Sequence, residues 1–305
     1  IAEGIGGWKP MLASDVDRLG YGDCKALTNY TKALLKSVGV ESYYTKLYGD
    51  HYKRDIQSDF VSQQGNHIIL AIPNGENYTW LECTSQDDPF GYQGVFTDDR
   101  NVLVIKPEGG EIVRTKIYED KENTQIDKGM YSIDENGNFS GSISIISEGS
   151  QYSSKQRLES FQPTEKEAHY KKYWGHINNL KLSKIAFTNN KENIRFTEDV
   201  QITAMNYASI SSNKMIFTLD AFNQNTENIK RIRNRKNPFQ IQRGYLDTDE
   251  IEINLPAGFS IEFLPSKFEL KGKFGEYKTE IIKKENNKRS RALRRLRLTK
   301  TSIFG

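Results

Sequence analysis

The first regular pattern along the chain is a set of apolar positions at helical spacing, shortly after a glycine-rich opening. These positions are Leu27, Tyr30, Leu34, Leu35 and Val38. Asp23 belongs to the residue types that cap helix starts, and Gly39 to those that end helices. The pattern predicts a helix from about residue 24 to residue 38, after an irregular segment over residues 1–20.

Two strand-like runs on either side of Asn74 and Gly75 predict a β-hairpin. Asn-Gly is the strongest short-range signal for a two-residue hairpin turn. A turn at these two residues places His67 directly opposite Glu82, with both side chains on the same face. Further strands are predicted before and after the hairpin, over residues 40–47 and 101–105.

The second half of the chain consists of short segments in which apolar and polar residues alternate. A hairpin is predicted around Asn136 and Gly137, and an amphipathic helix over residues 164–180. Further strands are predicted over residues 194–196, 200–207, 214–219, 250–255, 260–263 and 277–283. Several short strands at this spacing are typical of an antiparallel β-sandwich.

A charged segment without apolar periodicity lies between about residues 115 and 128 and marks a domain boundary. We therefore expect an α+β domain over residues 1–118 and a β-sandwich domain over residues 119–286. Residues 287–305 form a basic, low-complexity run that we expect to be a disordered or truncated tail. The chain opens on Ile1 without an initiator methionine, and we interpret the first domain as N-terminally truncated.

Charge is unevenly distributed along the chain. The 305 residues carry a formal net charge of +3. Residues 288–305 contribute seven positive charges and no negative one, so the remainder carries a net charge of −4. A slightly acidic body offers no general basic surface for nucleic acid. No run of about 18 apolar residues is present, so the sequence predicts no membrane span.

The two cysteines have different predicted environments. Cys24 lies in the first turn of the predicted helix, where unpaired backbone N–H groups and the helix dipole favour a thiolate and can bind an oxyanion. A buried, inert helix cysteine is the alternative. Cys83 points away from the hairpin face that carries Glu82, and we interpret it as a packing residue. One disulfide between the two cysteines is possible, but two cysteines do not form a disulfide framework.

A nucleophilic cysteine needs a base, and His67 opposite Glu82 is the candidate because a carboxylate fixes the imidazole tautomer and stabilises the imidazolium. His51 lies in a polar loop without a predicted carboxylate partner, so we interpret it as solvated. Gln64 and Asn66, beside His67, are candidate substrate-binding residues. His169 and His176 share a helix face, but without a third ligand at metal spacing they do not predict zinc.

Three sequence motifs together resemble the transglutaminase-like cysteine superfamily. These motifs are Gly-Asp-Cys-Lys over residues 22–25, Asn-His-Ile-Ile over residues 66–69 and Trp-Leu-Glu-Cys-Thr over residues 80–84. Residues 89–92 and 96–100 are similar to bacterial secreted proteins in which a transglutaminase core lies between two β-rich domains. Residues 255–259 and 274–277 match the following β-rich domain, and from residue 287 the similarity ends.

The resemblance implies a papain-like or transglutaminase-like core fragment in which Cys24 is the nucleophile and His67 the base. Glu82 stands where the superfamily usually has aspartate. Superfamily members place an aromatic residue or glutamine upstream near the nucleophile, which suggests Trp8 as a cleft residue; packing against the helix is the alternative. The resemblance also implies a secreted or periplasmic location.

We therefore expect cysteine-dependent acyl transfer on peptide or protein amides, without a metal or organic cofactor. Attack of water on the acyl-enzyme gives peptidase or amidase activity, and attack of a lysine amine gives cross-linking. The residues do not decide between these outcomes. The alternative function is a catalytically inactive binding or structural module of the same superfamily.

Overall fold

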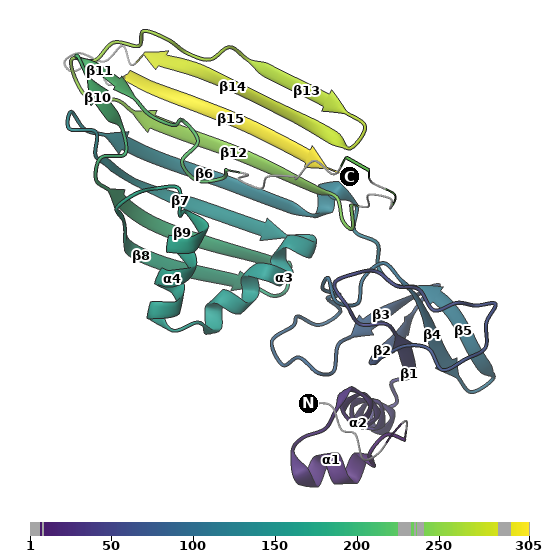
Figure 1. Ribbon diagram of the computed structural model, residues 1–305. Helices are drawn as coiled ribbons and strands as arrows, with labels where there is room; N and C mark the ends of the chain where they lie inside the picture. The colour runs from purple at the N-terminus through teal and green to yellow at the C-terminus, as the bar shows by residue number, and fades with distance from the viewer. Residues whose placement is uncertain are drawn as a thin grey trace. The chain divides into compact units, whose positions relative to one another are not determined.

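The computed structural model describes Gly7 and residues 9–224, 233–234, 236, 241–285 and 294–304. The chain folds into two compact units (Figure 1). The first comprises residues 1–118 and 191–194, and the second comprises residues 119–190 and 195–305. Within the described ranges, no helix is long and apolar enough to cross a membrane.

The first unit is built on a five-stranded antiparallel sheet with the strand order β3-β2-β1-β4-β5. Its helices and strands are α1 (Ala13–Leu19), α2 (Cys24–Ser37), β1 (Tyr43–Leu47), β2 (His67–Asn74), β3 (Asn77–Leu81), β4 (Asn101–Lys106) and β5 (Gly109–Arg114). A small apolar core lies on one face of the sheet, with Leu47, Ile69 and Val104 at its centre. The hydroxyl of Thr28 on α2 donates to the backbone carbonyl of Ile68 at 3.4 Å, which joins this helix to β2.

The predicted bounds of the first helix are confirmed, because α2 runs from Cys24 to Ser37 with Asp23 as its N-cap. Gly39 follows the helix in the left-handed region with a φ of 78°, as expected of a helix-ending glycine. The predicted apolar stripe is only partly buried, since Leu34 is 50% exposed. The short helix α1 was not predicted, because it buries only Val16 and has no side-chain cap at its start.

The predicted hairpin exists, but its turn lies one residue later than expected. Asn74 pairs with Asn77, so Gly75 and Glu76 form the turn. Gly75 has a φ of 61°, which suits the first central position of a type II′ turn, where glycine is preferred. The pairing register therefore differs by two residues from the prediction, which leaves every side chain on its predicted face.

The second unit contains an eight-stranded sheet with the order β13-β14-β15-β12-β6-β7-β9-β8 (Figure 1). Its strands are β6 (Thr124–Ile133), β7 (Phe139–Glu148), β8 (Leu180–Asn190), β9 (Arg195–Ala204), β12 (Tyr245–Asn254), β13 (Phe268–Gly272), β14 (Gly275–Glu285) and β15 (Arg294–Phe304). A separate hairpin is formed by β10 (Ser209–Ser211) and β11 (Lys214–Ile216). The central strands β6 and β12 are parallel, and the other strand pairs are antiparallel.

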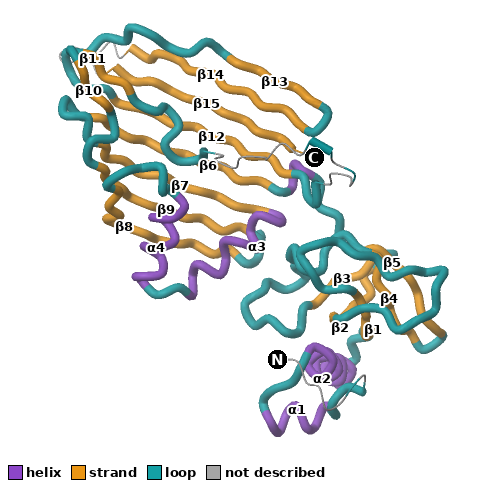
Figure 2. The backbone as a smooth tube through the Cα atoms, viewed as in Figure 1, coloured by secondary structure: helices purple, strands orange, loops and turns teal. Residues whose placement is uncertain are grey.

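Helices cover part of one face of this sheet, across β7, β8 and β9 (Figure 2). The helices of the unit are η1 (Asp120–Glu122), η2 (Gly149–Gln151), α3 (Tyr152–Lys155), η3 (Gln156–Ser160) and α4 (Pro163–Tyr173). Tyr170 of α4, Trp174 just after it and Phe222 are fully buried against the sheet. This aromatic cover supplies the second layer of the core.

The expected fold class, an α+β papain-like core followed by a β-sandwich, is wrong. The chain is mostly β, with fifteen strands and four α-helices among the described residues. The described part of the first unit shows no clear papain-like core. Among its described residues, the second unit has one large curved sheet that forms a half-barrel, and the small β10–β11 hairpin. Helices and aromatic side chains, rather than a second large sheet, cover the inner face of the half-barrel.

The basic segment expected as a tail contributes a strand to the centre of this sheet. Residues 294–304 form β15 between β12 and β14, while residues 287–293 and 305 lie outside the described part. The sequence from Arg295 to Leu298 alternates arginine and leucine, which is the period-two pattern of a strand. The abundance of basic residues concealed this alternation.

A buried pair of carboxyl groups lies where the parallel strands meet. Asp127 of β6 pairs with Asp249 of β12, and both residues are fully buried. Burial raises the pKa of Asp127 well above its usual range, and the neighbouring charge of Asp249 raises it further. The charge of Lys155 acts in the opposite direction, while those of Asp247 and Glu198 add to the upward shift. The shift therefore favours the protonated form of Asp127 in the folded protein.

This proton makes stability depend on pH. The unfolded chain releases the Asp127 proton near pH 4, whereas the folded protein holds it to higher pH, so stability falls as pH rises above about 4 until the folded protein releases it too. Asp127→Asn should remove a slope of up to about 1.4 kcal/mol per pH unit from the unfolding free energy. Urea unfolding of both proteins at pH 5 and pH 8 measures the slope.

In the control Asp134→Asn, the lost carboxylate has a lowered pKa because the Asn138 side chain and backbone donate to it, so its contribution has the opposite sign. Equal slopes in the parent protein and Asp127→Asn would contradict the prediction.

Candidate active site

The candidate nucleophile lies at the start of α2. Cys24 is the first helical residue and is half-buried. The Asp23 carboxylate accepts a hydrogen bond from the Ala26 backbone N–H at 3.0 Å and also contacts the Lys25 ammonium group. The Ile68 backbone on β2 lies close to the Cys24 sulfur and lowers its pKa. The sulfur therefore lies between β2 and the helix start, where the first backbone N–H groups have no partner within the helix.

The candidate base is the first residue of β2. His67 is 9% exposed, and its Nε2 lies 2.7 Å from Oε2 of Glu82. The imidazole also lies close enough to the Cys24 thiol for each group to shift the pKa of the other. Because Glu82 occupies Nε2, the ring nitrogen left for the sulfur is Nδ1. The structure thus brings Cys24, His67 and Glu82 into one chain of contacts.

The carboxylate reaches the imidazole along a diagonal of the hairpin. Glu82 follows the end of β3, and the observed register places it two residues away from the position opposite His67. Diagonal side chains on one face are farther apart than directly paired ones, and a long side chain is needed to join them. The Thr84 backbone N–H donates to Oε1 of Glu82 at 3.0 Å, and the Thr84 hydroxyl contacts the same oxygen. Thr84 thereby fixes the carboxylate in its extended position.

Burial disfavours the charged forms of Cys24, His67 and Glu82, but the interactions between these three groups outweigh the effect of burial on their pKa values. Burial alone would raise the pKa of Cys24, yet the hydrogen bond and charge of His67 lower it below its usual value. Burial alone would lower the pKa of His67, yet the hydrogen bonds that its ring donates to Cys24 and Glu82, together with the negative charges of these groups, raise it to about 9. Burial would also raise the pKa of Glu82, which His67 and Thr84 lower. The three shifts favour a thiolate, an imidazolium and a carboxylate near neutral pH.

The diagonal geometry predicts that aspartate cannot replace Glu82. Glu82→Asp shortens the side chain by one methylene group and should separate the carboxylate from Nε2 of His67. Without that partner the imidazolium is less stable, so the pH midpoint of Cys24 alkylation by iodoacetamide should rise by about one unit or more. The matched control Glu76→Asp, in the exposed hairpin turn, should leave the midpoint unchanged. An unchanged midpoint in Glu82→Asp would show that the carboxylate does not act on the pair.

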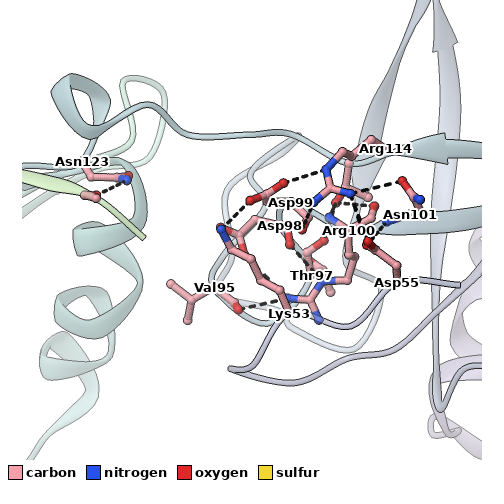
Figure 3. A network of polar contacts seen from close by, with 12 residues as sticks. Lys53, Asp55, Val95, Thr97, Asp98, Asp99, Arg100, Asn101, Arg114 and Asn123 are labelled. Atoms are coloured by element: carbon pink, nitrogen blue, oxygen red, sulfur yellow. Dashed lines mark hydrogen bonds and ion pairs between the residues drawn. The ribbon is translucent and has the colours of Figure 1, made fainter. Parts of the chain in front are cut away.

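A buried arginine holds the loops beside the histidine (Figure 3). Arg100 is fully buried, and its guanidinium donates to the backbone carbonyls of Tyr48, of Asp50 at 3.1 Å and of Val95 at 3.5 Å. Its Nε donates to the Asp98 carbonyl at 2.9 Å, and the Asp98 carboxylate lies 3.7 Å away. These contacts tie residues 48–50 to residues 95–98.

The other residues predicted to line a cleft have different positions. The Asn66 amide accepts from the Gly49 backbone N–H at 2.7 Å and donates to its carbonyl at 3.2 Å, so it fixes a loop. The Gln64 amide bonds the backbone of Gln57 and Phe60. Both side chains are thus engaged in loop structure. Trp8 lies outside the described residues.

The remaining cysteine and histidines take no part in the contacts that join Cys24, His67 and Glu82. Cys83 is a free thiol whose pKa is raised by burial, although Thr31 and Thr28 of α2 partly offset the rise. His51 contacts the edge of Phe96 in an exposed loop. In the second unit, the His176 ring contacts the Ala221 carbonyl at 2.9 Å. Among the described residues, no group of three or more His, Cys, Asp or Glu side chains is placed to hold a metal ion.

The sequence did not predict a role for four residues that lie at or near the site. Thr84 and Arg100 lie in motifs that carried the resemblance, but their contacts depend on the fold. Phe96 packs against the His67 ring with centroids 5.3 Å apart. Tyr44 of β1 lies near the nucleophile, since its pKa is raised by burial and further by the charges of Cys24 and Asp23. No short-range signal in the sequence brings these side chains to residues 24 and 67.

Comparisons with known proteins cover only the end of the chain. A family described as a domain of unknown function with solved-structure structure (DUF3858) matches residues 213–303. Neither a curated protein nor a solved structure matches the chain significantly. The family match runs from β11 through β15, so it includes most of the basic segment that was expected to fall outside the similarity.

Proposed function

We propose that the first unit is a cysteine-dependent acyl transferase or hydrolase that acts on peptide or protein amides, with the chemistry of the transglutaminase-like cysteine superfamily. The observation that carries the proposal is the continuous set of contacts from the Cys24 thiol through His67 to Glu82. A nucleophile, a base and an orienting carboxylate in contact are the parts that covalent acyl transfer requires.

The first half of the reaction forms a thioester. The Cys24 proton is already on His67 in the ion pair, and the sulfur attacks the amide carbonyl carbon. The oxygen gains negative charge and is stabilised by backbone N–H groups at the start of α2. The carbon–nitrogen bond then breaks, and the leaving ammonia or amine takes the proton from His67.

The second half releases the acyl group. Water or a primary amine gives a proton to the neutral His67 and attacks the thioester carbonyl carbon. The carbon–sulfur bond breaks, and the Cys24 thiolate and His67 imidazolium are restored. Glu82 supports both halves because it stabilises the imidazolium each time that it forms. The product is a carboxylic acid with water and a new amide with an amine.

The acyl-enzyme gives the most direct test. The protein is mixed with p-nitrophenyl acetate, and the release of nitrophenolate and the mass of the Cys24 peptide are followed. We expect a burst of nitrophenolate with an acetyl group on Cys24, and faster turnover when a primary amine or hydroxylamine is added. Cys83→Ala should behave as the parent protein, and Cys24→Ala should lose the burst.

An inactive binding module gives the opposite result. In that case acetylation of Cys24 is no faster than acetylation of Cys83, and Cys24→Ala releases nitrophenolate at the parent rate. Acetyl transfer to added amine rather than water would favour cross-linking over hydrolysis as the proposed reaction.

A further inference from the structure

An exposed aromatic ring lies directly against the proposed catalytic base. The ring centroids of Phe96 and His67 are 5.3 Å apart at an interplanar angle of 73°, an edge-to-face contact. The His51 ring also lies near Phe96, with the ring centroids 6.5 Å apart at an interplanar angle of 75°. Despite these two neighbours, Phe96 remains 43% exposed. Part of its apolar surface is therefore available beside the imidazole.

The backbone around Phe96 is held from both sides. The Phe96 carbonyl accepts a hydrogen bond from the Asp50 backbone N–H at 3.1 Å. The buried guanidinium of Arg100 bonds the carbonyls of Val95 and Asp98, one residue before and two residues after Phe96 (Figure 3). The exposed ring is thus carried by a loop whose backbone is hydrogen-bonded on both sides of residue 96.

The ring position itself requires a glycine. A Cβ atom on Gly49 would lie 2.5 Å from the Phe96 ring and 2.9 Å from Cβ of His67. The backbone at residue 49 therefore lies too close to the Phe96 ring and to Cβ of His67 to carry a side chain, and the Asn66 amide holds it there. A fixed aromatic surface loses little conformational entropy when it binds a ligand.

From this arrangement we propose that Phe96 is the aromatic wall of the acyl-donor subsite, and that the donor carries an aromatic or large apolar group within a few bonds of the attacked carbonyl. The inference rests on the proposed function of Cys24 and His67. The attacked carbon must come within about 3.5 Å of the Cys24 sulfur, which itself contacts the His67 ring. A substituent close to that carbon then lies within reach of the ring that packs on His67.

Peptide electrophiles that differ in one side chain test the subsite. Cys24 is treated with N-acetyl-phenylalanyl and N-acetyl-aspartyl chloromethyl ketones, and with iodoacetamide as a reagent without a side chain. We expect the phenylalanyl reagent to modify Cys24 about tenfold faster than the aspartyl reagent, since covering an aromatic side chain is worth that much or more. Peptide mass spectrometry identifies the modified residue.

Variants of the wall separate recognition from nucleophile activation. Phe96→Ala should reduce the preference to about twofold, and Phe96→Leu should keep an intermediate preference. The preference is the ratio of the phenylalanyl to the aspartyl rate in the same protein, so a change in thiolate reactivity cancels. Phe90→Ala removes another exposed aromatic ring, 76% exposed and outside these contacts, and should keep the full preference.

The outcomes distinguish the two proposals. If iodoacetamide modifies Cys24 as an ordinary thiol, the proposed function fails, and the subsite fails with it. If iodoacetamide shows an activated thiolate but the two peptide reagents react equally fast, only the subsite is wrong. Retention of the full preference in Phe96→Ala would likewise overturn the role of Phe96.

Discussion

His67→Ala is expected to slow the alkylation of Cys24 by iodoacetamide at pH 6 by on the order of 100-fold. In the parent protein, His67 lowers the pKa of the Cys24 thiol through a hydrogen bond and its positive charge, against the upward effect of burial. Without the imidazolium, burial and the charge of Asp23 both act to raise that pKa. A thiol with a pKa of about 8.5 is less than about 1% ionised at pH 6, and only the thiolate reacts.

The pH dependence gives the prediction a characteristic shape. In the parent protein the reactive thiolate persists from the lowered Cys24 pKa upward, and His67 loses its proton only near its raised pKa of about 9. Between the lowered Cys24 pKa and the His67 pKa of about 9, alkylation should therefore change little with pH. In His67→Ala it should rise about tenfold per pH unit over most of this range.

Cys83 serves as a control within the same molecule. Burial raises its pKa, so it should react slowly at pH 6 in both proteins. Peptide mass spectrometry measures the two cysteines in one sample. Equal rates for Cys24 in the parent protein and in His67→Ala would show that no thiolate–imidazolium pair exists and would favour the binding-module alternative.

Arg100→Met is expected to destabilise the first unit by about 3–5 kcal/mol, a large part of the stability of a domain of this size. The arginine is fully buried and so is Asp98, whose carboxylate lies 3.7 Å from the guanidinium. Methionine fills similar volume but leaves the carbonyls of Asp50 and Asp98 without the donations that Arg100 makes. Buried polar groups that lose their partners carry the full cost of desolvation.

Hydrogen exchange followed by mass spectrometry measures this effect in the first unit alone, through peptides that contain β1 and β2. The matched control Arg114→Met removes an arginine that contacts Asp55 and Asp99 but is 40% exposed, and its expected cost is below about 1 kcal/mol. Equal protection in the two variants would contradict the role assigned to Arg100.

The sequence predicted the local elements of the candidate site more accurately than their arrangement. The helix start at Cys24 depends on the Asp23 cap and the apolar spacing, both of which are short-range signals. The contact between His67 and Glu82 was also expected, but by direct pairing across a turn at Asn74 and Gly75. The actual turn uses Gly75 at its first central position, and the longer glutamate side chain spans the resulting diagonal.

Sheet organisation could not be predicted from strand spacing. Short alternating segments are equally compatible with two facing sheets and with one sheet covered by helices, because both bury one side of every strand. The cover consists of Tyr170, Trp174 and Phe222, which come from a helix, its end and a loop far along the chain. The contacts of Arg100 depend in the same way on loops about 50 residues apart in sequence.

The parallel pairing of β6 and β12 has a consequence for how the second unit forms. Thr124 pairs with Leu246, so the middle of the sheet joins segments that are synthesised far apart in time. High contact order of this kind slows folding, and until β12 emerges from the ribosome β6 presents an open edge to other chains. The segment matched by the family, residues 213–303, contains β12 but not β6, its parallel partner, which comes earlier in the chain. We therefore expect nascent chains that end near residue 224 to be prone to aggregation, and refolding of the complete unit to be limited by the meeting of its two halves.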